Sequence, residues 1–261
     1  MDLLLKGKRA LVTGGNRGIG KAVARVLAQE GCDVVIAARN VEALEATAKE
    51  LKAETGAKIG TATVDTAFDD QVKAAVDKAV AFLGGLDILV NSAAVVAGGP
   101  APKLAQMNDK NFYDDVNVKV MGYLRMAREA APHMAKNGWG RIINISGLGA
   151  RQAGSIIGSV RNVAVAALTK NLADELGPQG INVTVVHPGG TKTEASEGRA
   201  KGMGMSMEDW EKRVGAGTAV GRMITAEEVA DVVAFLASPK SISNTGDAVA
   251  TGGGPKGVIY Y

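Results

Sequence analysis

The chain has 261 residues, a net charge of +3 and one cysteine, Cys32. It carries neither the basic run nor the aromatic interleaving of a nucleic-acid surface, and no apolar run approaches the roughly 18 residues of a membrane span. A lone cysteine excludes an internal disulfide and a cysteine metal cluster. We therefore expect a cytoplasmic protein with a small-molecule substrate and with no metal, nucleic-acid or membrane partner.

Short β-branched apolar segments alternate with longer segments of helical periodicity. The predicted strands are 9–13, 33–38, 58–64, 86–90, 141–145, 181–186 and 248–250, and the predicted helices are 18–30, 41–54, 69–83, 109–136, 156–176 and 226–236. Near-continuous apolar strands separated by helices are typical of a parallel sheet covered on both faces. The sequence predicts one α/β domain over 1–261, a Rossmann-type doubly wound parallel sheet of seven strands with helices on both faces.

Residues 190–217 break this alternation. The segment is rich in glycine, methionine and charge, and it shows no clear period. Irregular segments of this length in a compact domain usually act as lids or binding loops. We expect a lid-like segment here, although a surface loop without function is the other interpretation.

A glycine-rich turn, TGGNRGIG at 13–20, joins the first predicted strand to the first predicted helix. Such a turn must bend sharply, bring the backbone close to a pyrophosphate and start a helix packed on the sheet, and each task favours residues without Cβ. The helix N-terminus then presents free N–H groups to the phosphates. The residues expected at a nucleotide are Gly14, Asn16, Arg17, Gly18, Ile19 and Gly20.

The spacing of this turn resembles the T-G-x-x-x-G-x-G fingerprint of the short-chain dehydrogenase/reductase family. Further matches run nearly to the end of the chain, including NSAA at 91–94 and PGGTKT at 188–193. The resemblance implies hydride transfer between a nicotinamide and a carbonyl or alcohol. The further cofactor contacts that it implies are Asp65, Asn91, Ala93, Pro188, Gly189, Thr191 and Thr193.

The end of the second strand bears on the choice of nucleotide. A carboxylate there would bind the ribose 2′-hydroxyl of NAD, but this chain has Arg39 followed by Asn40. Arg39 is suited to pairing with a 2′-phosphate, and Arg17 adds a second positive charge. We expect NADP rather than NAD. Two solvated surface arginines are the alternative.

The resemblance fails at the family's catalytic tyrosine and at the lysine four residues later. The register of the helix at 156–176 puts Gly158 and Asn162 in those places, and no tyrosine lies between Tyr123 and Tyr260. The remaining catalytic candidates that the resemblance implies are Ser146 for the serine and Asn117 for the asparagine of the long helix. Asn162 can still bond the nicotinamide ribose, as a neutral group.

Two functional hypotheses follow. The first is an NADP-dependent oxidoreductase with an altered proton-transfer site, restricted to activated acceptors such as quinones, enones or electron-poor carbonyls. The second is a non-catalytic NADP-binding sensor or an inert subunit of a mixed oligomer. The helices at 109–136 and 156–176 correspond to those that pair across family dimers, so we expect a homodimer or homotetramer.

Overall fold

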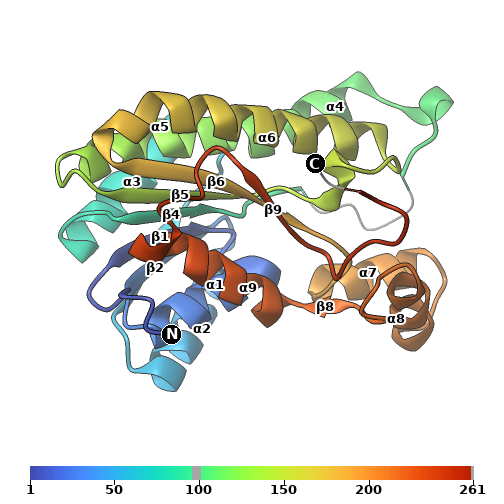
Figure 1. Ribbon diagram of the computed structural model, residues 1–261, viewed down its shortest axis with the longest axis horizontal. Helices are drawn as coiled ribbons and strands as arrows, with labels where there is room; N and C mark the ends of the chain where they lie inside the picture. Colours follow the sequence, from blue (N-terminus) through green and yellow to red (C-terminus); the bar gives the residue numbers. More distant parts are fainter. Residues whose placement is uncertain (96–100, 260–261) are drawn as a thin grey trace.

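The computed structural model describes residues 1–95 and 101–259. Its main sheet has seven parallel strands in the order β3-β2-β1-β4-β5-β6-β9 (Figure 1). These strands are β1 (Arg9–Thr13), β2 (Asp33–Ala38), β3 (Ile59–Thr63), β4 (Ile88–Asn91), β5 (Gly140–Ile145), β6 (Ile181–Pro188) and β9 (Ala248–Thr251). The strand order reverses between β1 and β4, as in a doubly wound sheet. The predicted fold class is confirmed.

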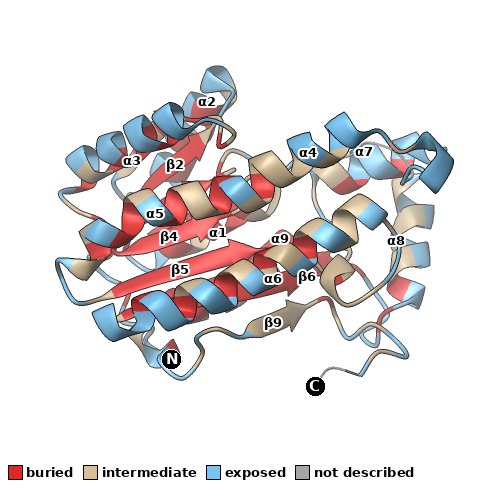
Figure 2. Ribbon diagram, turned by 90° about the horizontal axis from the view of Figure 1, so that it is seen from above, coloured by how far each residue is buried: buried red, intermediate tan, exposed pale blue. Residues whose placement is uncertain are grey.

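Helices cover both faces of this sheet. One face carries α1 (Gly18–Gln29), α2 (Val41–Thr55) and α9 (Ala226–Ala237), and the other carries α3 (Asp69–Leu83), α5 (Gly122–Ala135) and α6 (Ile156–Leu176). Each layer buries its own apolar cluster against the strands, so β5 and β6 are buried along their whole length (Figure 2). Strands buried on both faces need the continuous apolar runs that the sequence shows. The short 3₁₀ helices are η1 (Leu104–Gln106), η3 (Leu148–Ala150), η4 (Gly177–Gln179) and η5 (Pro239–Ser241).

The long helix predicted over 109–136 is divided by a π-helical turn. It consists of α4 (Asp109–Val116), the π turn η2 (Asn117–Met121) and α5. The wider turn leaves carbonyl groups exposed along the helix, and two side chains satisfy them. Thr66 Oγ1 donates to the Val118 carbonyl at 2.8 Å, and Arg125 Nη1 donates to the Asn117 carbonyl at 3.2 Å. The contact from Thr66 comes from a distant part of the sequence, so local sequence patterns do not predict this π turn.

Residues 190–217 are not the irregular loop that the sequence predicted. They contain β7 (Thr191–Lys192), paired with β8 (Ile224–Thr225), and two helices, α7 (Glu194–Gly202) and α8 (Met207–Ala216). Each helix has a hydroxyl N-cap: Thr193 accepts from the Ser196 amide, and Ser206 from the Asp209 amide. The caps start both helices, although α7 has little apolar periodicity of its own. Both helices lie beyond the carboxyl ends of the strands (Figures 1 and 2).

Candidate active site

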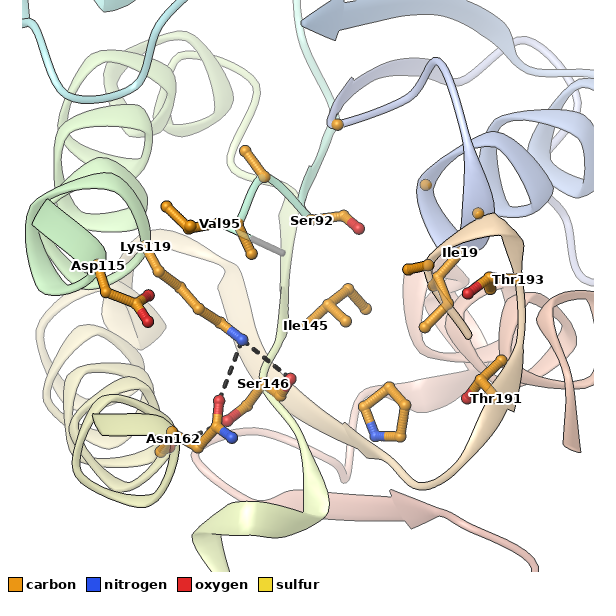
Figure 3. A pocket seen from close by; sticks show the side chains of 18 of the residues that line it. Ile19, Ser92, Val95, Asp115, Lys119, Ile145, Ser146, Asn162, Thr191 and Thr193 are labelled. Atoms are coloured by element: carbon orange, nitrogen blue, oxygen red, sulfur yellow. Dashed lines mark hydrogen bonds between the residues drawn. The ribbon is translucent and has the colours of Figure 1, made fainter. Parts of the chain in front are cut away.

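A cavity of about 1190 Å³ lies at the carboxyl ends of β1, β4, β5 and β6 (Figure 3). This is where a doubly wound sheet binds its ligands, because the connections on either side of the switch in strand order diverge there. The sequence-predicted residues that line it are Gly14, Asn16, Arg17, Gly18, Ile19, Gly20, Arg39, Asn40, Asp65, Ala93, Ser146, Asn162, Pro188, Gly189, Thr191 and Thr193. Asn91 and Asn117 do not contribute to the lining.

The glycine-rich turn has the close backbone packing expected of a phosphate cradle. A Cβ on Gly20 would lie 2.2 Å from the Gly14 carbonyl oxygen, and a Cβ on Gly15 would lie 2.8 Å from the Ile36 side chain. Gly14 and Gly18 have φ of +64° and +51°, which side-chain-bearing residues rarely adopt. Larger residues would push α1 away from the turn. The residues present therefore fit a dinucleotide pyrophosphate at the N-terminus of α1.

One amide of this N-terminus already has an anionic partner. The Gly18 N–H donates to Glu194 Oε2 at 3.0 Å. This carboxylate connects the first turn of α7 to the glycine-rich turn at 13–20, called the phosphate turn below. The contact shows that this amide can donate to a negatively charged oxygen. It also means that a phosphate group at Gly18 would have to displace the Glu194 side chain.

The end of the cavity next to β2 contains the predicted positive charges. Arg17 and Arg39 are exposed at its rim. Arg39 Nη1 lies 3.9 Å from Asp65 Oδ2, while Asp65 Oδ1 accepts from the Ala67 amide at 3.1 Å. Asn40, next to Arg39, caps α2 through its side chain, which accepts from the Ala43 amide. Arg39 is thus free to face a phosphate on its solvent side, and Asp65 is held at the cavity edge.

The opposite end of the cavity is formed where β5 meets α6. Ser146 Oγ donates to the Asn162 carbonyl at 3.0 Å, so this hydroxyl is bonded to the helix backbone. Gly158, one turn earlier on α6, also lines the cavity and exposes backbone there. Gly147 follows Ser146, and a Cβ there would lie 3.0 Å from Asn162 Nδ2. The Asn162 side chain therefore packs closely against the backbone at the end of β5.

Lys119 is a site residue that the sequence analysis missed. It lies in the π turn, is 3% exposed, and extends from its helix toward Ser146 and Asn162 (Figure 3). Its Nζ donates to the Ser146 carbonyl at 3.0 Å and to Asn162 Oδ1 at 3.1 Å. Burial, with the positive charge of Arg161, lowers the pKa of Lys119 to about 7 against the opposing effect of Asp115.

A periodic signal for Lys119 was present in the sequence. The buried residues that follow it are spaced by three and four positions and define the inward face of the helix. They are Gly122, Tyr123, Met126, Ala127, Ala130, Ala131 and Met134. Lys119 continues this face toward the N-terminus, although the π turn interrupts the regular helix.

The structure does not bring Asn117 into the cavity as the resemblance implied. Its Nδ2 lies 3.5 Å from the Ala67 carbonyl, because the π turn directs Asn117 toward the α3 side and Lys119 toward α6. Asn91 is fully buried behind the lining, where its Nδ2 donates to Asn144 Oδ1 at 2.9 Å. It can support the end of β4 but does not face the cavity.

His187 is a further ionisable side chain near the site. Burial, together with the charges of Arg151 and Lys119, lowers the pKa of His187 to about 4, so this ring is neutral at pH 7.

Within 1–95 and 101–259, no group of three His, Cys, Asp or Glu side chains is placed to hold a metal ion. No helix in the same ranges is long and apolar enough to cross a membrane.

Comparison with known proteins agrees with this geometry. A model of the family described as enoyl-(acyl carrier protein) reductase matches residues 14–256. The chain belongs to the short-chain dehydrogenase/reductase family. Short-chain reductase protein NovJ of Streptomyces niveus is 35% identical over 246 residues, covering 94% of this chain and 92% of that relative.

Two solved structures show the same fold with a nucleotide present. L-sorbose reductase from Gluconobacter frateurii, complexed with NADPH and L-sorbose, has a TM-score of 0.91 at 29% identity and covers 99% of this chain and 100% of its own. A short-chain dehydrogenase from Burkholderia cenocepacia J2315, in complex with NADP, has a TM-score of 0.84 at 34% identity and covers 96% of this chain and 98% of its own.

The Glu194 contact generates a prediction about ligand affinity. Glu194→Gln removes the negative charge that competes with phosphate at the Gly18 amide. We expect the variant to bind NADPH about three- to tenfold more tightly, roughly 0.7–1.4 kcal/mol, as measured by fluorescence titration. Glu197→Gln, in the same first turn of α7 and exposed, is the control and should leave the affinity unchanged. Equal affinity of wild type and Glu194→Gln would contradict the competition.

Proposed function

We propose that the protein is an NADP-dependent oxidoreductase that transfers hydride to or from a carbonyl, enone or quinone, with a proton-transfer site unlike that of its family. The observation that carries this proposal is one continuous cavity with the phosphate turn at one end and a buried lysine at the other. The NADPH and NADP complexes of the similar structures support the cofactor.

The residues of the turn would hold the dinucleotide, and Thr191 and Thr193 would lie along its nicotinamide half. When bound, NADPH supplies a hydride from its nicotinamide ring. Gly158 and Asn162 stand where the resemblance places the family's tyrosine and lysine, so α6 offers neither a phenol nor a cation at those positions. An acceptor whose reduced oxygen is a weak base depends least on a strong proton donor. We therefore infer activated acceptors as the substrate class.

A screen of NADPH consumption tests this function. Quinones, enones and electron-poor ketones should be reduced, and unactivated ketones should react at least about a hundredfold more slowly, since general acid catalysis is worth 10²–10⁴-fold. Absorbance at the reduced nicotinamide band measures both. Equal rates for both classes would contradict the restriction to activated acceptors.

A second candidate is a non-catalytic NADP-binding sensor or inert subunit. The hydrogen bond from Ser146 to the α6 backbone favours it, because this hydroxyl is engaged inside the protein. NADPH binding without consumption in the screen would support this candidate over the oxidoreductase.

The choice of nucleotide rests on Arg39 and Arg17. NADPH should bind at least about tenfold more tightly than NADH, a difference of roughly 1.4 kcal/mol. Arg39→Ala should remove most of that difference, because it deletes the cation at the end of β2. Lys49→Ala, an exposed cation on α2 outside the cavity, is the matched control. Calorimetric titrations that give equal wild-type affinities for the two nucleotides would contradict the proposal.

We also propose that the protein forms a homodimer or homotetramer through α6. Ile156, Val160 and Val163 are 48%, 46% and 51% exposed, and with Ala167 they form one apolar row along the outer face of the helix. The spacing of four, three and four residues aligns this row on one side. Apolar rows of this kind are buried in helix–helix interfaces.

Light scattering at micromolar concentration should give a dimer or tetramer for the wild type. Val163→Glu places a charge in the row and should shift the protein toward the monomer. Val41→Glu makes the same substitution at an exposed valine of α2, on the opposite face of the sheet, and should not change the assembly. A monomeric wild type would refute the interface.

A further inference from the structure

Lys119 is buried among neutral partners. Of the lysines that the structure describes, it alone is buried, and its Nζ donates to a backbone carbonyl and an amide oxygen. An ammonium has three N–H bonds, and these contacts use two of them. The residue also lines the cavity. The third N–H is therefore available to a group bound there (Figure 3).

The burial of this charge is not compensated by a carboxylate. Asp115 is the acidic side chain whose field reaches Lys119, but it forms its ion pair with Arg161. No described carboxylate lies within ion-pair distance of Lys119 Nζ. Burying an ammonium without an anionic partner is costly. A methionine would fill the same space without the free-energy cost of burying a charge. Packing alone therefore does not explain a lysine at this position.

The ionisable groups around Lys119 lie on α4, α5, α6 and β6. Burial is the main cause of the lowered pKa of Lys119; Arg161 on α6 also disfavours the ammonium, and Asp115 on α4 opposes that effect. Tyr123 on α5 is neutral, since its OH donates to the Ile145 carbonyl and burial raises its pKa. The positive charge of Lys119 helps to keep His187 on β6 neutral. Lys119 therefore titrates near neutral pH, where an acid can both hold and release a proton.

We propose that Lys119 is the catalytic acid–base residue that exchanges a proton with the substrate oxygen. The inference rests on the proposed oxidoreductase function and names the group that completes it. Lys119 and Asn162 also reverse the arrangement that the resemblance implies, in which the lysine belongs to α6 and an asparagine to the long helix. The ammonium therefore enters the same part of the cavity from the neighbouring helix.

The chemistry balances with the reduced nicotinamide as the hydride donor. In the direction of reduction, a ring C–H bond of the bound nicotinamide would break and supply the hydride, a C–H bond would form at the acceptor carbon, and the electron pair of the C=O π bond would move to the oxygen. An O–H bond then forms as an Nζ–H bond of Lys119 breaks, which leaves a neutral amine. The acceptor is reduced, the nicotinamide is oxidised, and the amine regains its proton from water. Asn162 and the Ser146 carbonyl hold Nζ in position throughout.

Nuclear magnetic resonance of protein labelled with [6-¹³C]lysine tests the premise without catalysis. One lysine resonance should titrate between about pH 6 and 8 in the NADPH complex and should be missing in Lys119→Met. Lys110→Met, an exposed lysine paired with Asp114 on α4, is the control and should retain that resonance. A Lys119 resonance that titrates only above pH 9 would overturn the assignment.

Kinetics with an acceptor from the screen provide the second test. With an electron-poor ketone, whose reduced oxygen is a stronger base than that of a reduced quinone, Lys119→Met should lower kcat/KM for reduction by at least about a hundredfold, remove the fall in rate above pH 7 and change the NADPH Kd by less than about threefold. Lys110→Met should match the wild type. The exchange variant Lys119→Asn with Asn162→Lys should recover at least about tenfold over Lys119→Asn alone, because it returns an ammonium to the same space.

The outcomes separate this inference from the function on which it rests. Wild-type protein that does not bind NADPH, or that binds it and reduces no acceptor, overturns the oxidoreductase function and with it any catalytic role for Lys119. Wild-type protein that reduces an acceptor while Lys119→Met keeps its rate and pH profile overturns only the assignment to Lys119. A secondary amine trapped at Lys119 by borohydride in the presence of the acceptor would show covalent catalysis and would also overturn proton donation.

Discussion

The burial of both faces of the parallel sheet is the constraint on which the rest of the structure depends. Strands covered by helices on each side leave few places for uncompensated polar groups along their length. Polar side chains and free backbone groups therefore collect where the strands end. All seven strands of the main sheet run in the same direction, so their carboxyl ends share one edge and the cavity forms there.

The two ends of this cavity favour negative charge by different means. At the glycine-rich turn, the N–H groups at the start of α1, of which that of Gly18 donates to Glu194, and the exposed Arg17 and Arg39 provide positive potential in contact with solvent. At the β5–α6 end, Lys119 provides a single ammonium that solvent barely reaches. Electrostatic interactions are stronger in the second environment because the local dielectric is lower. The cavity thus combines an exposed anion-binding end with a buried end suited to stabilising charge that develops on oxygen.

The position of Lys119 depends on contacts from four parts of the chain. Thr66, after β3, and Arg125, on α5, bond the carbonyl groups that the π turn leaves free. Gly122 allows the helix to approach Thr66, since a Cβ there would lie 2.8 Å from the threonine side chain. The Ser146 carbonyl and the Asn162 amide then fix Nζ. A change in any of these contacts would move the ammonium, although Thr66, Ser146 and Asn162 are all far from Lys119 in sequence.

The sequence by itself determined the fold and the phosphate turn of this protein. Apolar strand segments and helical periods are local patterns, and the glycines at 14, 18 and 20 meet local steric requirements, so neither depends on distant partners. Tertiary structure decided the rest. The caps at Thr193 and Ser206 start two helices within residues 190–217, and β7 at the beginning of this segment pairs with β8. The π turn rotates Asn117 away from the cavity and Lys119 into it, because Thr66 and Arg125 satisfy the carbonyls that such a turn exposes.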